Sequence, residues 1–402
     1  MRRIASFLLL LSLLITLPGC GLSGTSGKTQ DSSQESAEET PPTPEPYTIL
    51  DPTVQPEGGE RDGVPYVAYD GVVEHLFFHP VVAYPELAFD GDSKANGIDD
   101  YMVTADEYKK ILQSVYDKGY ILVDINSVWS EVTGEDGQPH MVKNTLYLPE
   151  GKKPLVLSFD DTNYYEYMLS NGFTWKLVLG DDGKIASWGK DPQGNEVVSR
   201  DLDAIPILDK FVEEHPDFSP FGAKGCLSLT GYEGILGYRT QTDTKSWTQA
   251  QEENRQKEIA AVKPIIAELK RTGSHTWGHI RLGSKSLEAI QADTQRWFDE
   301  VGSLVGPTTI LFYPHGERPD GNDWQNTGPV FRYLQSQGFR VFCSVGIESF
   351  SYIKKDICAV ICDRLHPDGT TLRYSRDRYL KFYDAKDIMD TAVRPQREIA
   401  WS

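Results

Sequence analysis

The sequence predicts an α/β fold built on a mostly parallel sheet or barrel. The main observation is that helix and strand patterns alternate along the chain from about residue 64, as they do where helices connect parallel strands. The 402 residues allow one large domain or two modest ones, and 39% apolar with 11% aromatic residues are enough for a hydrophobic core. The sequence contains no repeat of fixed period.

A capping box and two apolar runs define the first elements. Thr104 begins a helix, because Glu107 stands three residues later and apolar residues then recur on one helical face. Gly119 is expected to end that helix, and residues 120–125 predict a strand. Residues 154–159 predict a second, buried strand that ends in two acids.

The remaining elements continue the alternation. Helices are predicted over residues 205–214, 251–270, 287–301 and 330–337, and strands over residues 223–230, 308–312 and 340–344. Pro264 lies within the second of these helices, and Gly273 is expected to end it. Two glycine-containing turn sequences predict hairpins, and we expect an insertion over about residues 180–245.

The N-terminus predicts export and attachment to a membrane. Two arginines precede an apolar run, residues 4–17, that is shorter than the ~20 residues a bilayer-spanning helix needs. The run ends in Leu17-Pro18-Gly19-Cys20, which resembles a bacterial lipobox, so Cys20 is the expected lipidation site. We therefore expect a lipoprotein signal peptide over residues 1–19 and an extracytoplasmic protein anchored to the bacterial cell membrane. Ordinary secretion with cleavage nearby is the alternative.

Composition narrows the partners further. Residues 20–64 are rich in Ser, Thr, Gly, Glu and Pro, which predicts a disordered tether before a folded domain over residues 65–402. The net charge of −19 argues against a nucleic-acid partner, whose footprint is a basic face. Buried free thiols, rather than a zinc site, are expected for the remaining cysteines, which are Cys226, Cys343, Cys358 and Cys362.

Two short segments contain the residues expected to carry out chemistry. Asp160 and Asp161 follow the buried strand, and catalytic groups in α/β folds gather at the carboxyl ends of strands. His275 and His279 are four residues apart between glycines, a spacing that lets both bind one metal ion. A turn and a pair of surface histidines would explain either segment alone. Together, one Asp and two His form a three-ligand set with open positions, as catalytic zinc and non-haem iron sites require, and the other carboxylate can act as a base.

In this order, Ser158-Phe159-Asp160-Asp161 and His275-Thr276-Trp277-Gly278-His279 resemble the first two motifs of the polysaccharide deacetylases, the NodB-homology family. The resemblance spans roughly residues 65–390 and implies a distorted (β/α) barrel with fewer than eight repeats. It implies that Asp161, His275 and His279 bind a divalent metal ion, with zinc expected first and cobalt, nickel or another divalent ion as alternatives. It also implies that Asp160 is the general base and that a late histidine protonates the leaving amine.

The later motifs depart from the family pattern. Phe312 stands where the family has an arginine beside the base, and Thr162 replaces the glycine after the two acids. Arg364 is a candidate to replace that arginine in space. His366 is the candidate acid because it follows an apolar run expected to form the closing strand of the barrel; His315, His79, a water or a mere loop role for His366 are the alternatives. The residues expected to bind substrate are Tyr313, Pro314, His315 and His79.

The resemblance implies a metal-dependent hydrolase that removes N-acetyl groups from an extracellular or cell-wall polysaccharide. An N-acetylhexosamine glycan is the expected partner, and the protein is expected to be a monomer. The altered later motifs leave open a catalytically weakened carbohydrate-binding lipoprotein of the same fold. A solute-binding lipoprotein is the third interpretation; it shares the signal and tether but leaves the paired acids and histidines unexplained.

Overall fold

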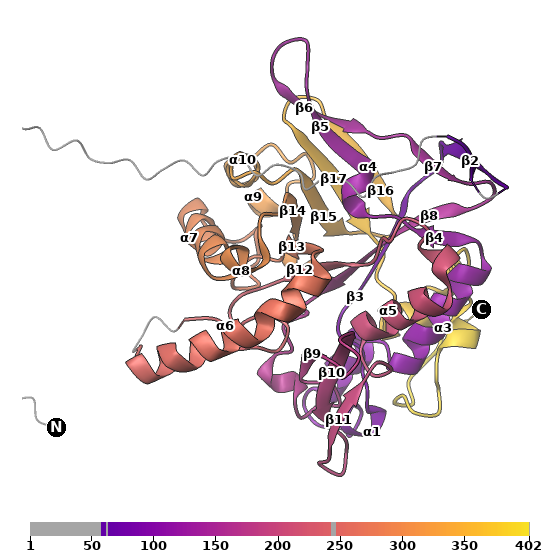
Figure 1. The fold of residues 1–402 in the computed structure, drawn as a ribbon, viewed down its shortest axis with the longest axis vertical. Coiled ribbons are helices and arrows are strands. Elements are labelled where there is room, and N and C mark those ends of the chain that lie inside the picture. Colours follow the sequence, from indigo (N-terminus) through magenta and orange to yellow (C-terminus); the bar gives the residue numbers. More distant parts are fainter. Residues whose placement is uncertain (1–57, 62, 243–246, 402) are drawn as a thin grey trace, which may run out of the picture. The chain divides into compact units, whose positions relative to one another are not determined.

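A computed structural model describes residues 58–61, 63–242 and 247–401 (Figure 1). The predicted signal peptide, Cys20 and most of the predicted tether lie outside the described residues. Two strands, β1 (Gly59–Arg61) and β2 (Val64–Tyr69), begin before residue 65, so the regular structure starts earlier than the predicted domain boundary. None of the described helices combines the length and the apolar character that crossing a membrane would require.

The described residues form a nine-stranded sheet at the centre of the fold. Its strands are β3 (Glu74–Phe78), β4 (Tyr120–Leu122), β8 (Lys153–Asp160), β12 (Cys226–Leu229), β13 (Thr272–Ser274), β14 (Ile310–Phe312), β15 (Val341–Val345), β16 (Phe350–Lys354) and β17 (Ala359–Arg364). Their order is β16-β17-β15-β14-β13-β12-β8-β3, with β4 also paired to β8. All pairs are parallel except β16 with β17, which is antiparallel.

The sheet closes between β3, at one end, and the residue after β17, the strand next to β16 at the other end. The backbone N–H of Phe77 in β3 donates to the carbonyl of Leu365, just after β17, over 2.9 Å, and the N–H of Leu365 donates back to the carbonyl of His75 over the same distance. The sheet is therefore a nearly closed barrel, and the predicted α/β fold with a distorted barrel is confirmed.

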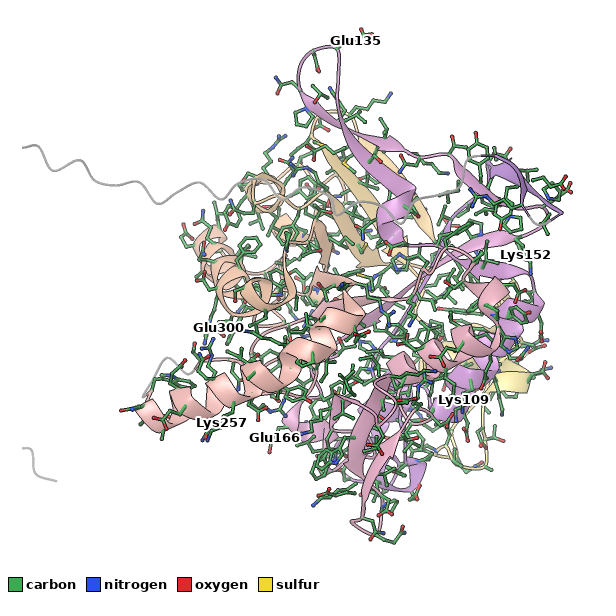
Figure 2. The ribbon with its side chains drawn as sticks, in the orientation of Figure 1. Lys109, Glu135, Lys152, Glu166, Lys257 and Glu300 are labelled. Atoms are coloured by element: carbon green, nitrogen blue, oxygen red, sulfur yellow. The ribbon has the colours of Figure 1, made fainter. Side chains whose placement is uncertain are left out.

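Helices between the strands cover the outside of the barrel. The longer ones are α3 (Ala105–Asp117), α5 (Ala204–Glu214), α6 (Gln249–Leu269), α7 (Leu287–Trp297) and α10 (Pro329–Ser336). Short helices are α1 (Pro85–Ala88), α2 (Ala95–Tyr101), α4 (Ile125–Val128), α8 (Ser303–Val305), α9 (Pro319–Asn322), α11 (Gly369–Tyr374), α12 (Arg376–Tyr379) and α13 (Ala385–Ile388). Single turns of other helix types are η1 (Glu166–Met168), η2 (Pro216–Phe218), η3 (Phe298–Gly302) and η4 (Pro314–Gly316). Charged side chains such as Lys257 on α6 lie on the surface (Figure 2).

The core follows the alternation of side chains along the strands. Leu311 of β14 packs outward in a cluster with residues of α7 and α10, whereas Ile310 and Phe312 pack with side chains of β4, β8, β15 and β17 in the barrel interior. A further cluster joins α3 and α5 to β3, β8 and β12. The predicted buried free thiols are confirmed for all four described cysteines, Cys226, Cys343, Cys358 and Cys362.

Most element predictions match the structure, with differences at the ends. The capping box of Thr104 and Glu107 begins α3 as predicted. Lys270, in the left-handed conformation, ends α6, so the prediction that Gly273 ends this helix was wrong. Gly273 lies in β13, where a Cβ would meet the Phe312 ring at 2.4 Å, so close strand packing explains the glycine. The predicted strand 120–125 stops at Leu122 because Asp124 caps α4.

The predicted hairpins form a small separate sheet. It contains β9 (Lys176–Leu179), β10 (Ile185–Lys190) and β11 (Glu196–Ser199), paired antiparallel. The predicted insertion over residues 180–245 was too long, because β12 lies inside that range and pairs with both β8 and β13 of the barrel. The other peripheral strands are β5 (Trp129–Thr133) and β6 (Pro139–Lys143), which form a hairpin, and β7 (Leu146–Pro149), which pairs with β2.

Candidate metal centre

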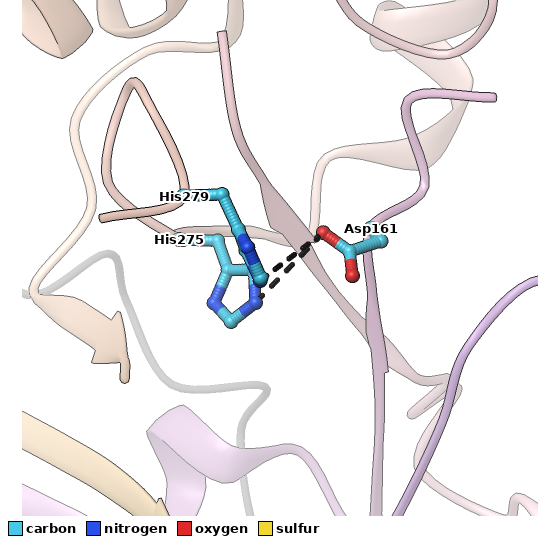
Figure 3. A group of neighbouring side chains, drawn as sticks. All are labelled: Asp161, His275 and His279. Atoms are coloured by element: carbon cyan, nitrogen blue, oxygen red, sulfur yellow. Dashed lines mark ion pairs between the residues drawn. The ribbon is translucent and has the colours of Figure 1, made fainter. Parts of the chain in front are cut away.

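Three residues predicted as metal ligands lie together at the ends of β8 and β13 (Figure 3). The possible ligand atoms of Asp161, His275 and His279 all lie within 4.8 Å of one another. The Nε2 atom of His279 is 3.7 Å, and that of His275 3.9 Å, from Oδ1 of Asp161. Two imidazole nitrogens and one carboxylate oxygen thus converge on one point, although they come from residues more than a hundred positions apart in the chain.

The turn after β8 holds Asp161 in an uncommon conformation. Its φ of 58° lies in the left-handed region, which costs a non-glycine residue about 1–2 kcal/mol. The neighbouring Asn163 stabilises the turn, because its side chain accepts from the backbone N–H of Thr230 over 3.1 Å and donates to the carbonyl of the same residue over 2.8 Å. The glycine of the family motif, replaced here by Thr162, is therefore not needed to reverse the chain.

The surroundings of the two histidines suit metal binding. Nδ1 of His275 lies 3.0 Å from the carbonyl oxygen of Phe312, which can only accept, so the ring proton is on Nδ1 and Nε2 keeps its lone pair toward Asp161. Burial lowers the pKa of His279 to about 4, so its imidazole is neutral at physiological pH, as a metal ligand must be. The donor set therefore fits a divalent cation, and three protein ligands with an open position are typical of catalytic zinc.

Beside the possible ligands, Asp160 is held by Arg364. The guanidinium donates to both carboxylate oxygens, with Nη1–Oδ1 and Nη2–Oδ2 distances of 2.8 Å. Burial alone would raise the pKa of Asp160, but the charge of Arg364 and its hydrogen bonds to the carboxylate act against burial, and the pKa lies below its usual value. The carboxylate is therefore ionised and can accept a proton.

Arg364 takes the place of the arginine that the third motif lacks. It is fully buried at the end of β17, and its guanidinium carbon lies 4.1 Å from the centre of the Phe77 ring and 4.7 Å from that of Phe312. Phe312, which stands at the position of the family arginine, instead forms part of the aromatic environment of an arginine from another strand. Thus Asp160, the predicted base, does have a positively charged partner.

A row of three polar residues, Asp368, His366 and His79, leads to Asp161. Nδ1 of His366 lies 3.0 Å from Oδ2 of Asp368, and its Nε2 shares a hydrogen bond of 3.0 Å with Nδ1 of His79. Nε2 of His79 in turn lies 3.7 Å from Oδ2 of Asp161. The His366 ring stacks on Phe77, with 4.3 Å between ring centres. His79 is thus the histidine of this row nearest to the possible metal ligands.

These groups open into one cavity of about 460 Å³. His315 also lines it, and its ring meets that of His279 with 4.4 Å between centres. Tyr313 and Pro314, which are predicted to bind substrate, are buried and are not among the residues that line the cavity. Tyr313 follows Phe312, which packs into the barrel, and alternation therefore directs Tyr313 outward into the cluster around α7 and α10.

Two residues at the rim of the cavity could not be predicted from the sequence. Tyr101, at the end of α2, and Arg281 both line it, and the side chains are more than half exposed. The position of α2 depends on Asp99, which is buried and accepts from Arg373 over 2.8 Å and from Arg394 over 2.9 Å. Because these partners come from the far end of the chain, no local pattern could place Tyr101 at the cavity.

Neither a protein-family model nor a curated protein matches this sequence. Among solved structures, the chain is similar to the Streptococcus pyogenes deacetylase PplD in complex with acetate, at 11% identity and a TM-score of 0.37, covering 75% of this chain and 95% of that one. It is also similar to IcaB from Ammonifex degensii, at 13% identity and a TM-score of 0.40, covering 75% and 94% of the two chains. These similarities concern the fold alone, so a function must be argued from the residues of the cavity.

Proposed function

We propose that this protein is a metal-dependent hydrolase that removes N-acetyl groups from an extracellular or cell-wall polysaccharide of N-acetylhexosamine. The observation that carries the proposal is that three side chains able to bind a metal line the same cavity as a carboxylate paired with a buried arginine. The motifs that resemble polysaccharide deacetylases supply these residues, and their arrangement suits hydrolysis of an amide.

Asp161, His275 and His279 would hold the divalent ion, which when bound supplies polarisation of the amide carbonyl and stabilisation of the developing negative charge. Asp160 is the general base that accepts a proton from the attacking water. Arg364 keeps that carboxylate ionised and fixes its orientation through both oxygens. The lone pairs of Asp160 not used by Arg364 remain available for the water.

Expulsion of the amine requires a proton on its nitrogen. His366 is the proposed source, because the carboxylate of Asp368 stabilises the protonated imidazole from its Nδ1 side. Its Nε2 is hydrogen-bonded to His79, so the pair offers a route by which the proton reaches the cavity. His366 and His79 both line this cavity with Asp160, so base and acid face the same bound substrate.

The altered third and last motifs favour the alternative of a weakened carbohydrate-binding protein, and in the third motif Phe312 stands in place of the arginine. Arg364 supplies a guanidinium to the base from β17, so this departure is no reason to expect lost turnover. A solute-binding protein would need neither the ligand set nor the paired base. We therefore favour an active hydrolase over both alternatives.

The direct test is to purify residues 58–402, load them with Zn²⁺, Co²⁺ or Ni²⁺, and measure bound metal and acetate release. The substrates are peptidoglycan, poly-N-acetylglucosamine and N-acetylglucosamine oligomers. Metal binding together with acetate release is expected. Metal binding without acetate release from any of these glycans would instead support the binding protein. The absence of both metal binding and acetate release would contradict the proposed site.

His366→Ala is expected to bind metal normally and to lose most turnover on N-acetyl amides. The loss should be much smaller on an acetyl ester with a good leaving group, because such a group departs without protonation. The measurement is kcat on both substrates, with His79→Ala compared in parallel. Equal losses on amide and ester in His366→Ala, or no loss on either, would remove His366 from proton delivery.

We also propose that the protein acts outside the cytoplasm as a monomer held at the cell membrane by lipid on Cys20, a residue outside the described part of the chain. Cys20→Ala is expected to move the protein from the membrane fraction to the soluble or secreted fraction, because the acyl chains provide the anchor. Fractionation followed by immunoblotting measures this. Unchanged membrane association of Cys20→Ala would contradict the lipid anchor.

A further inference from the structure

Three large aromatic side chains are exposed on β16 and on the neighbouring segment that Asn326 links to it. Trp324 is 61% exposed, and Phe350 and Tyr352 are each 37% exposed. Phe350 and Tyr352 lie on the same face of β16, with ring centres 6.1 Å apart and ring planes within 7° of parallel. We call these three residues the aromatic ridge. Exposed apolar surface gathered in one place usually marks a binding site.

The ridge is held in position by buried polar residues. The guanidinium carbon of Arg318 lies 3.7 Å from the centre of the Trp324 ring, and Arg318 is itself 2% exposed and paired with Asp363. The hydroxyl of Tyr352 accepts a hydrogen bond of 3.3 Å from Nδ2 of Asn326. Two of the three rings are therefore fixed by specific contacts, so little order is lost when a ligand stacks on them.

The ridge adjoins the wall of the cavity along the chain. Gly316 and Val345 line the cavity. From Val345 the chain passes through Ile347, which is 69% exposed, to Phe350, and from Gly316 it passes to Arg318 beneath Trp324. Both segments that form this wall thus continue directly into the ridge. Asp363, the partner of Arg318, also precedes Arg364, which holds the proposed base.

We propose that the aromatic ridge is an accessory glycan-binding surface, which holds a stretch of the polysaccharide whose neighbouring sugars enter the cavity. This inference rests on the proposed function for its choice of ligand. Pyranose rings present a face of C–H groups that packs on flat aromatic rings, while their hydroxyls meet polar tips such as that of Tyr352. Parallel rings on one strand suit successive sugars of an extended chain, and the ridge would strengthen binding of long glycans more than short ones.

The test measures binding without turnover. All proteins carry Asp160→Asn. One has the unaltered ridge, and the other is a double variant that also carries Trp324→Ala and Tyr352→Ala. Their affinities for peptidoglycan sacculi and for the soluble N-acetylglucosamine hexamer are compared. We expect at least a tenfold loss of affinity for sacculi, the size typical of removing aromatic anchors. Tyr374→Ala is the matched control, because Tyr374 is an aromatic residue, 45% exposed, on α11 rather than on the ridge. The affinity of the Tyr374→Ala control for sacculi should be unchanged.

Tyr352→Phe keeps the ring and should keep most of the affinity, and melting temperatures show whether each variant folds. If the double variant does not fold, Phe350→Ala replaces it, and this variant is also expected to lose affinity for sacculi. Unchanged affinity in folded ridge variants would overturn the proposal, as would a change in self-association, seen by sedimentation, with glycan binding intact. Acetate release by the unaltered protein, together with glycan binding that does not depend on the ridge, would contradict the proposed role of the ridge but not the proposed function. Ridge-dependent binding without acetate release would contradict the proposed function alone.

Discussion

Alanine at Asp161, His275 or His279 is expected to remove the metal and to abolish acetate release. Each substitution deletes one of only three protein donor groups, and a divalent ion held by two side chains exchanges readily with the solvent. Metal content after dialysis, measured by elemental analysis, checks the first effect, and acetate release checks the second.

Two controls separate metal binding from catalysis. Asp160→Asn keeps the shape of the side chain, so metal should remain while turnover falls by roughly 10²–10⁴-fold, the usual effect of a lost general base. His315→Ala removes a histidine of the same cavity that is not in the ligand set, and it should also retain metal. Metal loss in Asp160→Asn with retention in Asp161→Asn would show that the two acids have exchanged roles.

Arg364→Ala is expected to destabilise the protein by about 3–5 kcal/mol, because it leaves the buried carboxylate of Asp160 without its partner. It should also remove activity, since the base loses both its orientation and the charge that keeps it ionised. Urea unfolding and acetate release are the two measurements. Arg364→Lys keeps the charge but cannot donate to both oxygens in the same way, so its activity should fall while most of its stability is retained.

The explanation through an unpaired carboxylate can be isolated by a double substitution. Adding Asp160→Asn to Arg364→Ala removes the uncompensated charge, and part of the lost stability should therefore return. The pair does not have this energetic role if the free energy of unfolding of Arg364→Ala lies within about 1 kcal/mol of that of the wild type. The same conclusion follows if adding Asp160→Asn restores none of the lost stability.

Local sequence patterns were sufficient where one element carries the information. Asp160 and Asp161 follow a buried apolar strand, and the two histidines share one short segment after another strand, so their meeting at one end of the barrel followed from strand order. The parallel barrel followed from the alternation of helices and strands in the same way. Each of these segments can be recognised from its own short stretch of sequence.

Long-range partners could not be predicted in this way. Arg364 meets Asp160 across 204 positions, and His366 meets His79 across 287, so no spacing rule connects them. From the sequence, Arg364 was only a candidate to replace the missing arginine. His79 was predicted to bind substrate, and its hydrogen bond to His366 was not predicted. Tyr313 lies in the cluster around α7 and α10, a side-chain direction that its motif position alone does not indicate.

Removal and return of the metal tests the account most directly. The purified protein is treated with a chelator, and acetate release from an N-acetylglucosamine oligomer is measured while Zn²⁺ is added back in steps. We predict that chelation abolishes acetate release and that one equivalent of metal restores it in the wild type but not in His275→Ala. Acetate release that persists in the metal-free protein, or that is absent from the fully loaded protein, would contradict a metal-dependent deacetylase.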